Sequence, residues 1–502
     1  MGRYFRVLVF FILCLSMISS VAACTNTRGE IEQINIEIVD KMPNMPPQFK
    51  MIDWSKRARD FDAYVFDFNI KGEFLPVIWW DKTRKNFDQD IIGLPAYIGD
   101  ARQAGTDKHE SITVLSALLG ATLVGIDKSN QNGLNYIQMA KSYYNIDNGE
   151  GLILDTTDHD SGHSFWYELY PHILFYALAE LYPNEPQLME IVKKTADRWF
   201  EAVNIMCQGG KNINFNYNSF DFDTMTPNEL GPSEPDGAAG LAWIQYAAYK
   251  AFKDEKFLKA ADWTISFLEN CENSPYYEIL LPYGAYIAAR MNAECNKSYD
   301  VEKLVKWCFN LDPMSARTIS VTAGKWGDYY VDGLYVCWTD GHQYAFLMDT
   351  LSMAIPLVPL VRYDQRFAKS IGKWMLHAAN NARLFYPDEL PADNQSCPEL
   401  EGNSKQVVAY EGLHSKWGAK EPYADGDARR LGWAGTDFGV YGSSHAGVFG
   451  GIISRTSDER ILQLDCLKTD FFRDDAFPTY LYYNPYDEEK EIEINVGEGY
   501  KK

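Results

Sequence analysis

Acidic residues stand immediately before several segments that the sequence predicts to be helices. Asp236, with Glu234 two residues upstream, precedes one of them, Asp340 precedes another, and Glu411 lies in a later loop. Cleavage of a glycosidic bond needs a protonated carboxyl, which gives its proton to the leaving oxygen, and a carboxylate, which activates water or attacks the anomeric carbon. We expect Asp236 and Asp340 to form this pair, with Glu234 and Glu411 as reserves. Because an acid before a helix is also a common N-cap, a purely structural role is the alternative.

Aromatic residues are abundant, with 32 Tyr, 27 Phe and 13 Trp. The rings of Tyr and Trp can pack on a sugar while their polar atoms bond its hydroxyls. Five of the eight histidines lie in the same acid-rich loops. We therefore expect Trp166, Trp243, His342, Tyr410 and His445 to surround a bound sugar, the alternative for each being a role in the core or in bonding the backbone.

Several other chemistries are disfavoured by the sequence. It contains no Cys-x-x-Cys, no His-Glu-x-x-His, no Gly-x-Ser-x-Gly and no Gly-x-x-x-x-Gly-Lys. These are typical of zinc sites, metalloproteases, serine hydrolases and phosphate loops. The net charge of −22 also disfavours nucleic acid as a partner. We expect catalysis without a metal or cofactor.

The acidic loops lead into helices that come in pairs. Apolar residues recur at three- and four-residue spacing in runs broken by Gly, Pro, Asn and Asp. The predicted pairs are 111–126 with 134–144, 165–181 with 188–203, 237–252 with 257–268, 276–292 with 301–309, and 343–360 with 366–384. Long and irregular connections exclude a strict solenoid and favour a closed double ring with an inner and an outer helix in each hairpin. A sixth hairpin would come from the stretch before 110 or from 405–455.

The two ends of the chain differ from this helical part. Residues 461–464, 480–483 and 491–496 alternate apolar and polar side chains, which predicts strands. We therefore expect a helical domain over 51–455 followed by a small β element over 456–502.

The N-terminus reads as a secretory signal. Two arginines precede an apolar run that is too short to span a bilayer, and small residues follow it up to Cys24. The segment Val21-Ala-Ala-Cys24 resembles a bacterial lipobox. This predicts a signal peptide over 1–23, lipid on Cys24, a tether over 24–50, and a protein anchored in the periplasm or at the cell surface through that lipid alone. An ordinary signal peptide with an incidental cysteine is the alternative.

Several segments carry a resemblance to a known family, which covers about 110–490. They are Glu234-Pro-Asp-Gly-Ala-Ala-Gly-Leu-Ala-Trp, Pro282-Tyr-Gly-Ala, Tyr299-Asp-Val-Glu-Lys-Leu, Tyr441-Gly-Ser-Ser-His and Thr479-Tyr-Leu-Tyr-Tyr-Asn-Pro-Tyr. The chain resembles secreted bacterial proteins of the six-hairpin glycosidase superfamily and is similar to its β-glucuronidase-containing group, glycoside hydrolase family 154. The resemblance implies an (α/α)6 barrel and an exo-acting hydrolase of oligo- or polysaccharides that acts on terminal uronic acids. It assigns no catalytic residue.

Two other functions stay open at this point. Helical toroids also host uronate polysaccharide lyases, for which Tyr410, His342 and His445 would carry the elimination. A surface lipoprotein that binds glycans without cleaving them would need the aromatic residues but no acid pair.

Overall fold

The computed structural model describes residues 31–338 and 343–494. One compact unit begins at Ile34. The predicted signal peptide, Cys24, Asp340 and His342 lie outside the described residues. Among the helices of the described ranges, none has the length and apolarity that crossing a membrane requires.

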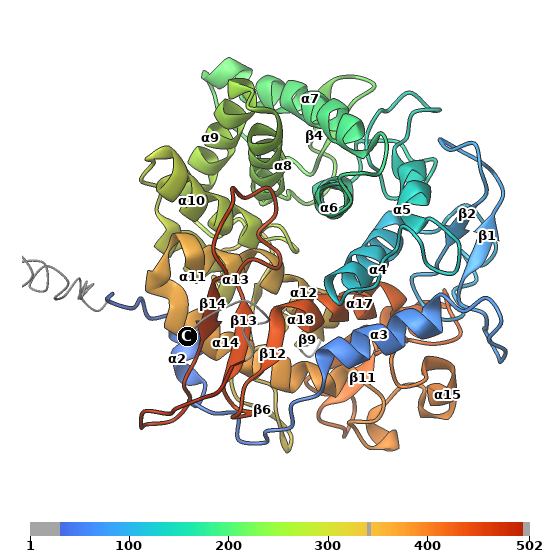
Figure 1. Ribbon diagram of the computed structural model, residues 1–502, viewed down its shortest axis with the longest axis vertical. Coiled ribbons are helices and arrows are strands. Elements are labelled where there is room, and N and C mark those ends of the chain that lie inside the picture. The colour runs from blue at the N-terminus through green and yellow to red at the C-terminus, as the bar shows by residue number, and fades with distance from the viewer. Residues whose placement is uncertain (1–30, 339–342, 495–502) are drawn as a thin grey trace, which may run out of the picture. The chain divides into compact units, whose positions relative to one another are not determined.

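Six inner helical segments form a closed ring within residues 34–338 and 343–494 (Figure 1). Each packs against the next, and the last packs against the first. Because side chains on every side of these segments are buried, their sequences are apolar throughout rather than along one stripe. The segments are α4 (Ser111–Leu123), α6 (Phe165–Leu181), α8 (Gly237–Phe252), α10 (Leu281–Cys295), α12 with α13 (Leu347–Ser352 and Ala354–Tyr363), and α17 with α18 (Val440–Ser443 and Ala446–Ile452).

Outer helices alternate with the inner ones along the described chain. They are α3 (Trp54–Val65), α5 with the 3-10 turn η1 (Tyr136–Met139 and Ala140–Tyr143), α7 (Leu188–Met206), α9 (Glu255–Asn270), α11 (Val301–Phe309) and α14 (Ala368–Asn381). The longer ones are amphipathic: in α7, buried Val192, Ala196 and Trp199 follow one face. The predicted (α/α)6 arrangement is confirmed. The sixth hairpin draws on both candidate stretches, since α3 comes from before 110 and packs against α18 from 405–455.

Small residues close the ring where α4 meets α18. A Cβ atom built on Gly447 would lie 2.1 Å from the carbonyl oxygen of Gly120. One turn earlier in α4, the hydroxyl of Ser116 bonds the hydroxyl of Ser444, which lies between α17 and α18. Because the two glycines have no side chains, the backbones of α4 and α18 can touch, and the last inner helix packs directly on the first.

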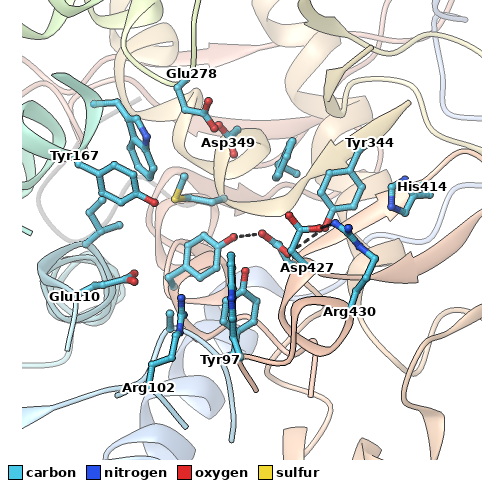
Figure 2. Close-up of a pocket in the computed structure, with 18 of the residues that line it drawn as sticks. Tyr97, Arg102, Glu110, Tyr167, Glu278, Tyr344, Asp349, His414, Asp427 and Arg430 are labelled. Atoms are coloured by element: carbon cyan, nitrogen blue, oxygen red, sulfur yellow. Dashed lines mark hydrogen bonds and ion pairs between the residues drawn. The ribbon is translucent and has the colours of Figure 1, made fainter. Parts of the chain in front are cut away.

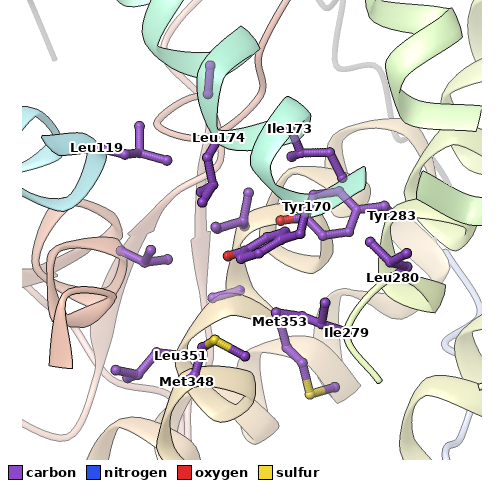
Figure 3. Close-up of a cluster of buried hydrophobic side chains, with 14 of the residues drawn as sticks. Leu119, Tyr170, Ile173, Leu174, Ile279, Leu280, Tyr283, Met348, Leu351 and Met353 are labelled. Atoms are coloured by element: carbon purple, nitrogen blue, oxygen red, sulfur yellow. The ribbon is translucent and has the colours of Figure 1, made fainter. Parts of the chain in front are cut away.

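Side chains fill the middle of the ring. Figure 3 shows Leu119, Tyr170, Leu174, Tyr283 and Leu351 converging from α4, α6, α10 and α12. Each of them is at most 2% exposed. The middle of the barrel is therefore a packed core.

A five-stranded antiparallel sheet, which the sequence did not predict, lies among the connections. Its order is β11-β10-β9-β8-β5, formed by Tyr423–Asp425, Gly412–His414, Tyr344–Phe346, Tyr335–Cys337 and Ile319–Val321. Strand β9 occupies the start of the predicted helix 343–360, so that helix begins at Leu347. The predicted helix 276–292 likewise begins only at Leu281, because residues 276–280 form a loop with buried apolar side chains.

Shorter elements complete the connections. Two-stranded sheets join β1 (Trp79–Asp81) to β2 (Ile91–Gly93), β3 (Ser219–Asp221) to β4 (Thr226–Asn228), and β6 (Lys325–Trp326) to β7 (Tyr329–Tyr330). The short helices are α2 (Glu37–Lys41), α15 (Glu401–Ser404) and α16 (Asp427–Leu431).

The compact unit and the C-terminal sheet both begin earlier in the chain than the sequence predicted. Residues 34–50, assigned to a tether, lie in the compact unit, because Ile36, Val39 and Met42 are buried there. The C-terminal sheet begins at β12 (Ile453–Arg455) and continues through β13 (Leu462–Asp465) and β14 (Tyr480–Tyr482), which confirms two of the three expected strands. Residues 491–494 are not in a strand, and 495 and 496 lie outside the described residues.

Candidate functional site

A cavity of about 740 Å³ lies at the end of the ring where inner helices begin. Its walls come from the first turns of α4, α6, α12 and α17, the loop before α10, strands β9 and β10, and the segments around them. The lining residues are Ala96, Tyr97, Arg102, Glu110, Ile112, Trp166, Tyr167, Glu278, Arg317, Tyr344, Phe346, Met348, Asp349, Glu411, His414, Trp417, Asp427, Arg430, Trp433 and Tyr441. Carboxyls, arginines and aromatic rings therefore share one hollow.

Asp349 is the most unusual acid in this cavity. It lies in the first turn of α12, is 1% exposed, and neither of its oxygens has a hydrogen-bond partner within the described residues. Burial raises the pKa of Asp349 well above its ordinary value, and the nearby charge of Glu278 raises it further. This environment favours the protonated form of the carboxyl, and neither oxygen is already bonded to another described group.

Glu110 supplies a second carboxyl from another wall. It stands immediately before α4, and Figure 2 shows it well apart from Asp349 and Glu278, which lie together. The amide of Gln103 donates a hydrogen bond to Glu110 Oε1 at 3.0 Å. Burial raises the pKa of Glu110 to about 7, although the charge of Arg102 acts in the opposite direction. Glu110 can therefore gain or lose a proton near neutrality.

Glu278 lies beside Asp349 and forms an ion pair with Arg317. Asp236, one of the predicted catalytic acids, supports the loop that carries Glu278. It is fully buried, does not line the cavity, and accepts hydrogen bonds from the backbone N–H groups of Tyr277 (3.2 Å) and Glu278 (3.3 Å). Burial raises its pKa to about 7. The structure thus gives Asp236 a place behind Glu278.

Glu234 also lies behind the cavity wall. Its carboxylate accepts hydrogen bonds from the Ser164 hydroxyl at 2.8 Å and from the Trp166 N–H at 3.1 Å. Burial raises the pKa of Glu234 to about 8. These bonds satisfy groups at the start of α6, so Glu234 fixes the helix end that carries Trp166 into the cavity.

Glu411 is the predicted acid that lines the cavity itself. It accepts hydrogen bonds from the hydroxyls of Tyr441 (2.6 Å) and Tyr344 (3.2 Å) and from the N–H of Asp427 (2.8 Å). A Cβ atom on Gly426 would lie 2.9 Å from Glu411 Oε2, so the glycine leaves room for the carboxylate. Burial raises the pKa of Glu411. Its oxygens are more fully engaged than those of Asp349.

The predicted sugar-binding residues divide between the cavity and the core. Trp166 lines the cavity. Trp243 is buried against other rings in the core, and the hydroxyl of buried Tyr410 donates to the side chain of Gln395 at 3.1 Å. His445 lies behind the wall, where its ring bonds the Tyr170 hydroxyl and burial lowers its pKa to about 4.

Most of the cavity was not predicted from the sequence. The unpredicted residues that could act on a ligand include Tyr97, Arg102, Glu110, Tyr167, Tyr344, Asp349, Trp417 and Arg430. One signal was present: Asp349 is the only acidic residue between 343 and 363, in an otherwise apolar stretch. An isolated acid there must be buried at a cost, which favours a functional role.

Within the described part of the chain, no cluster of three or more His, Cys, Asp or Glu side chains is placed to hold a metal ion.

No family model and no curated protein matches the chain. Solved structures whose backbones can be aligned with this chain include three of unsaturated glucuronyl hydrolase from Streptococcus agalactiae. One mutant is 12% identical with a TM-score of 0.41, covering 84% of this chain and 97% of that one. A second mutant, in complex with dGlcA-GalNAc6S, is 12% identical with a TM-score of 0.32 over 68% and 78%. The unmutated enzyme is 13% identical with a TM-score of 0.33 over 68% and 77%. These values do not establish a family for this chain.

Proposed function

We propose that this protein is a glycoside hydrolase in which Asp349 is the proton donor and Glu110 is the base. The observation that carries the proposal is the pairing of the two carboxyls in one cavity. Asp349 is buried and its oxygens have no described partner, whereas the pKa of Glu110 is about 7. Two carboxyls whose environments hold one protonated and leave the other able to ionise are what glycosidic cleavage requires.

The reaction balances with water alone. Asp349 gives its proton to the glycosidic oxygen as the bond from that oxygen to the anomeric carbon breaks. Glu110 takes a proton from a water molecule, whose oxygen forms the new bond to the anomeric carbon. A pKa near 7 suits a base that works at neutral pH, whereas a direct carboxylate nucleophile would need a lower value. Transfer of the proton from Glu110 to Asp349 through solvent restores both groups.

A terminal uronic acid is the sugar we propose for this cavity. Arg102 and Arg430 line it, and an arginine has five N–H donors, so pairing with one carboxylate still allows it to bind another. The resemblance to the β-glucuronidase-containing group points to the same sugar.

We also propose that the protein is exported and held by lipid on Cys24, on the strength of the sequence 21–24. Cys24→Ser should move the protein from the membrane fraction to the soluble fraction. A mutant that still partitions with membranes would contradict the anchor.

An array of glycosides tests the activity. The wild type should cleave methyl or aryl β-glucuronides, or oligosaccharides that end in glucuronic acid, and Glu110→Gln should abolish turnover for every leaving group while the circular dichroism spectrum is retained. Binding without any product would instead favour the glycan-binding lipoprotein. An unsaturated product would favour a lyase, although Tyr410 and His445, which that reading requires, do not line the cavity.

A further inference from the structure

The hairpin between β10 and β11 carries an exposed tryptophan on the rim of the cavity. Trp417 lines the cavity and is nevertheless 41% exposed. Two backbone hydrogen bonds hold its turn: Trp417 N–H donates to the Lys420 carbonyl at 2.9 Å, and Lys420 N–H donates to the Trp417 carbonyl at 3.0 Å. The ring is therefore presented by a defined turn of the hairpin.

Trp417 belongs to a cluster of aromatic rings that Tyr344 connects to Glu411. The Tyr344 hydroxyl donates to Glu411, and the Tyr344 ring lies 4.3 Å from that of His414, centroid to centroid. The ring of His414 lies 5.2 Å from that of Trp417, at an angle of 30°. The ring of Tyr423, the cross-strand partner of His414, lies 6.3 Å from that of Trp417 at an angle of 17°. Figure 2 shows Tyr344 and His414 together on the side of the cavity away from Glu110.

We propose that Trp417 forms a subsite for the sugar ring on the leaving-group side of the bond that is cut. The proposal rests on the glycosidase function proposed above. An exposed indole costs free energy in water, and the C–H face of a pyranose removes that surface from water when it packs on the ring. Tyr423 and His414 fix the plane of the indole, so the surface is ready before the sugar arrives. The substrate class is therefore an oligosaccharide whose leaving group is itself a sugar.

The test compares two substrates that share a terminal sugar. One is methyl β-D-glucuronide, and the other is a disaccharide in which β-glucuronic acid is linked to N-acetylglucosamine. We expect Trp417→Ala to lower the ratio of kcat/KM for the disaccharide to kcat/KM for the methyl glycoside by about tenfold, the effect of leaving part of one large apolar ring unburied. Trp417→Leu, which keeps bulk but loses the flat ring, should lower it similarly, whereas Trp417→Phe should restore most of it.

Trp80 provides a matched control, because it is 37% exposed, stacks on Phe68 at 5.0 Å, and does not line the cavity. Trp80→Ala should leave the ratio unchanged. An unchanged ratio in folded Trp417→Ala and Trp417→Leu would overturn the subsite. If the wild type cleaves neither substrate, the proposed hydrolase function is refuted, and the subsite remains to be tested by binding. Calorimetry with the disaccharide then decides the subsite: weaker binding to Trp417→Ala supports it, and equal binding, or no binding to either protein, overturns it.

Discussion

Replacement of Asp349 by asparagine removes the transferable proton and keeps the shape of the side chain. Because neither carboxyl oxygen is hydrogen-bonded within the described residues, the substitution breaks no bond of the resting site. Loss of a general acid costs about a hundred- to ten-thousandfold in rate, which corresponds to about 3–5 kcal/mol of barrier. A nitrophenolate departs without help from an acid, whereas a methoxide or a sugar alkoxide does not. We therefore expect Asp349→Asn to lose most of its activity on methyl and sugar glycosides and much less on 4-nitrophenyl β-glucuronide.

The same substitution should stabilise the fold at neutral pH. The pKa of Asp349 is raised in the folded protein, so the stability that its protonated form provides is fully present below the unfolded value of about 4 and is lost as pH rises through the folded value. The asparagine does not titrate. The difference in Tm between Asp349→Asn and the wild type should therefore shift in favour of the mutant as the pH rises above about 4.

Kinetics for the three leaving groups and melting curves across pH give both results. Equal losses on good and poor leaving groups, or wild-type turnover of the methyl glycoside, would refute the assignment of Asp349 as the proton donor.

Other predictions address the base, the support behind the wall and the closure of the ring. The plot of kcat/KM against pH should rise with an apparent pKa near 7 as Glu110 ionises. Arg102→Gln removes the positive charge beside Glu110 and should move this rise to higher pH, whereas Arg102→Lys keeps the charge and should not. A rise at the same pH in both variants would exclude Glu110 as the base. The wild type should lose up to about 4 kcal/mol of stability between about pH 4 and 7, and Asp236→Asn should remove this loss, as melting at both pH values can check. Turnover should fall less in Asp236→Asn than in Asp349→Asn, and a larger rate loss in folded Asp236→Asn would return Asp236 to the catalytic pair. Gly447→Ala should lower the free energy of unfolding, measured with urea, by about 1–3 kcal/mol or more because it overpacks α4 against α18. Gly402→Ala, whose Cβ meets nothing within 4 Å, should change it little, and equal effects of the two substitutions would contradict the close contact.

Helices with clear apolar periodicity could be predicted from the sequence almost to the residue. The expected helices 165–181, 237–252 and 301–309 coincide with α6, α8 and α11. Errors arose where burial did not follow a helical period. Residues 276–280 are apolar because a loop buries them, and the strands of the five-stranded sheet have only three residues each, too few to show alternation.

The expectation that functional residues gather where inner helices begin pointed to the end of the ring that holds the cavity, but it named only part of the cavity lining. It led to Glu411 and Trp166, which line the cavity, and to Asp236 and Glu234, which lie one layer behind it. Trp243 belongs to a helix that is apolar on every side, so a core position and a cavity position look alike in its sequence.

Which acids line one cavity depends on the tertiary arrangement. Asp349 and Glu110 are far apart in the chain and line the same cavity only because the ring closes. No local pattern joins them, although the isolation of Asp349 among apolar residues was visible in the sequence.

The mass balance of the products tests the central claim most directly. The wild type is incubated with an oligosaccharide that ends in β-glucuronic acid, and the products are weighed by mass spectrometry. Hydrolysis predicts two fragments whose masses add up to the substrate plus one water molecule, with no ultraviolet absorbance from an unsaturated uronate. Fragments whose masses add up to the substrate alone would show elimination and would contradict the assignment of Asp349 and Glu110 as a hydrolytic pair.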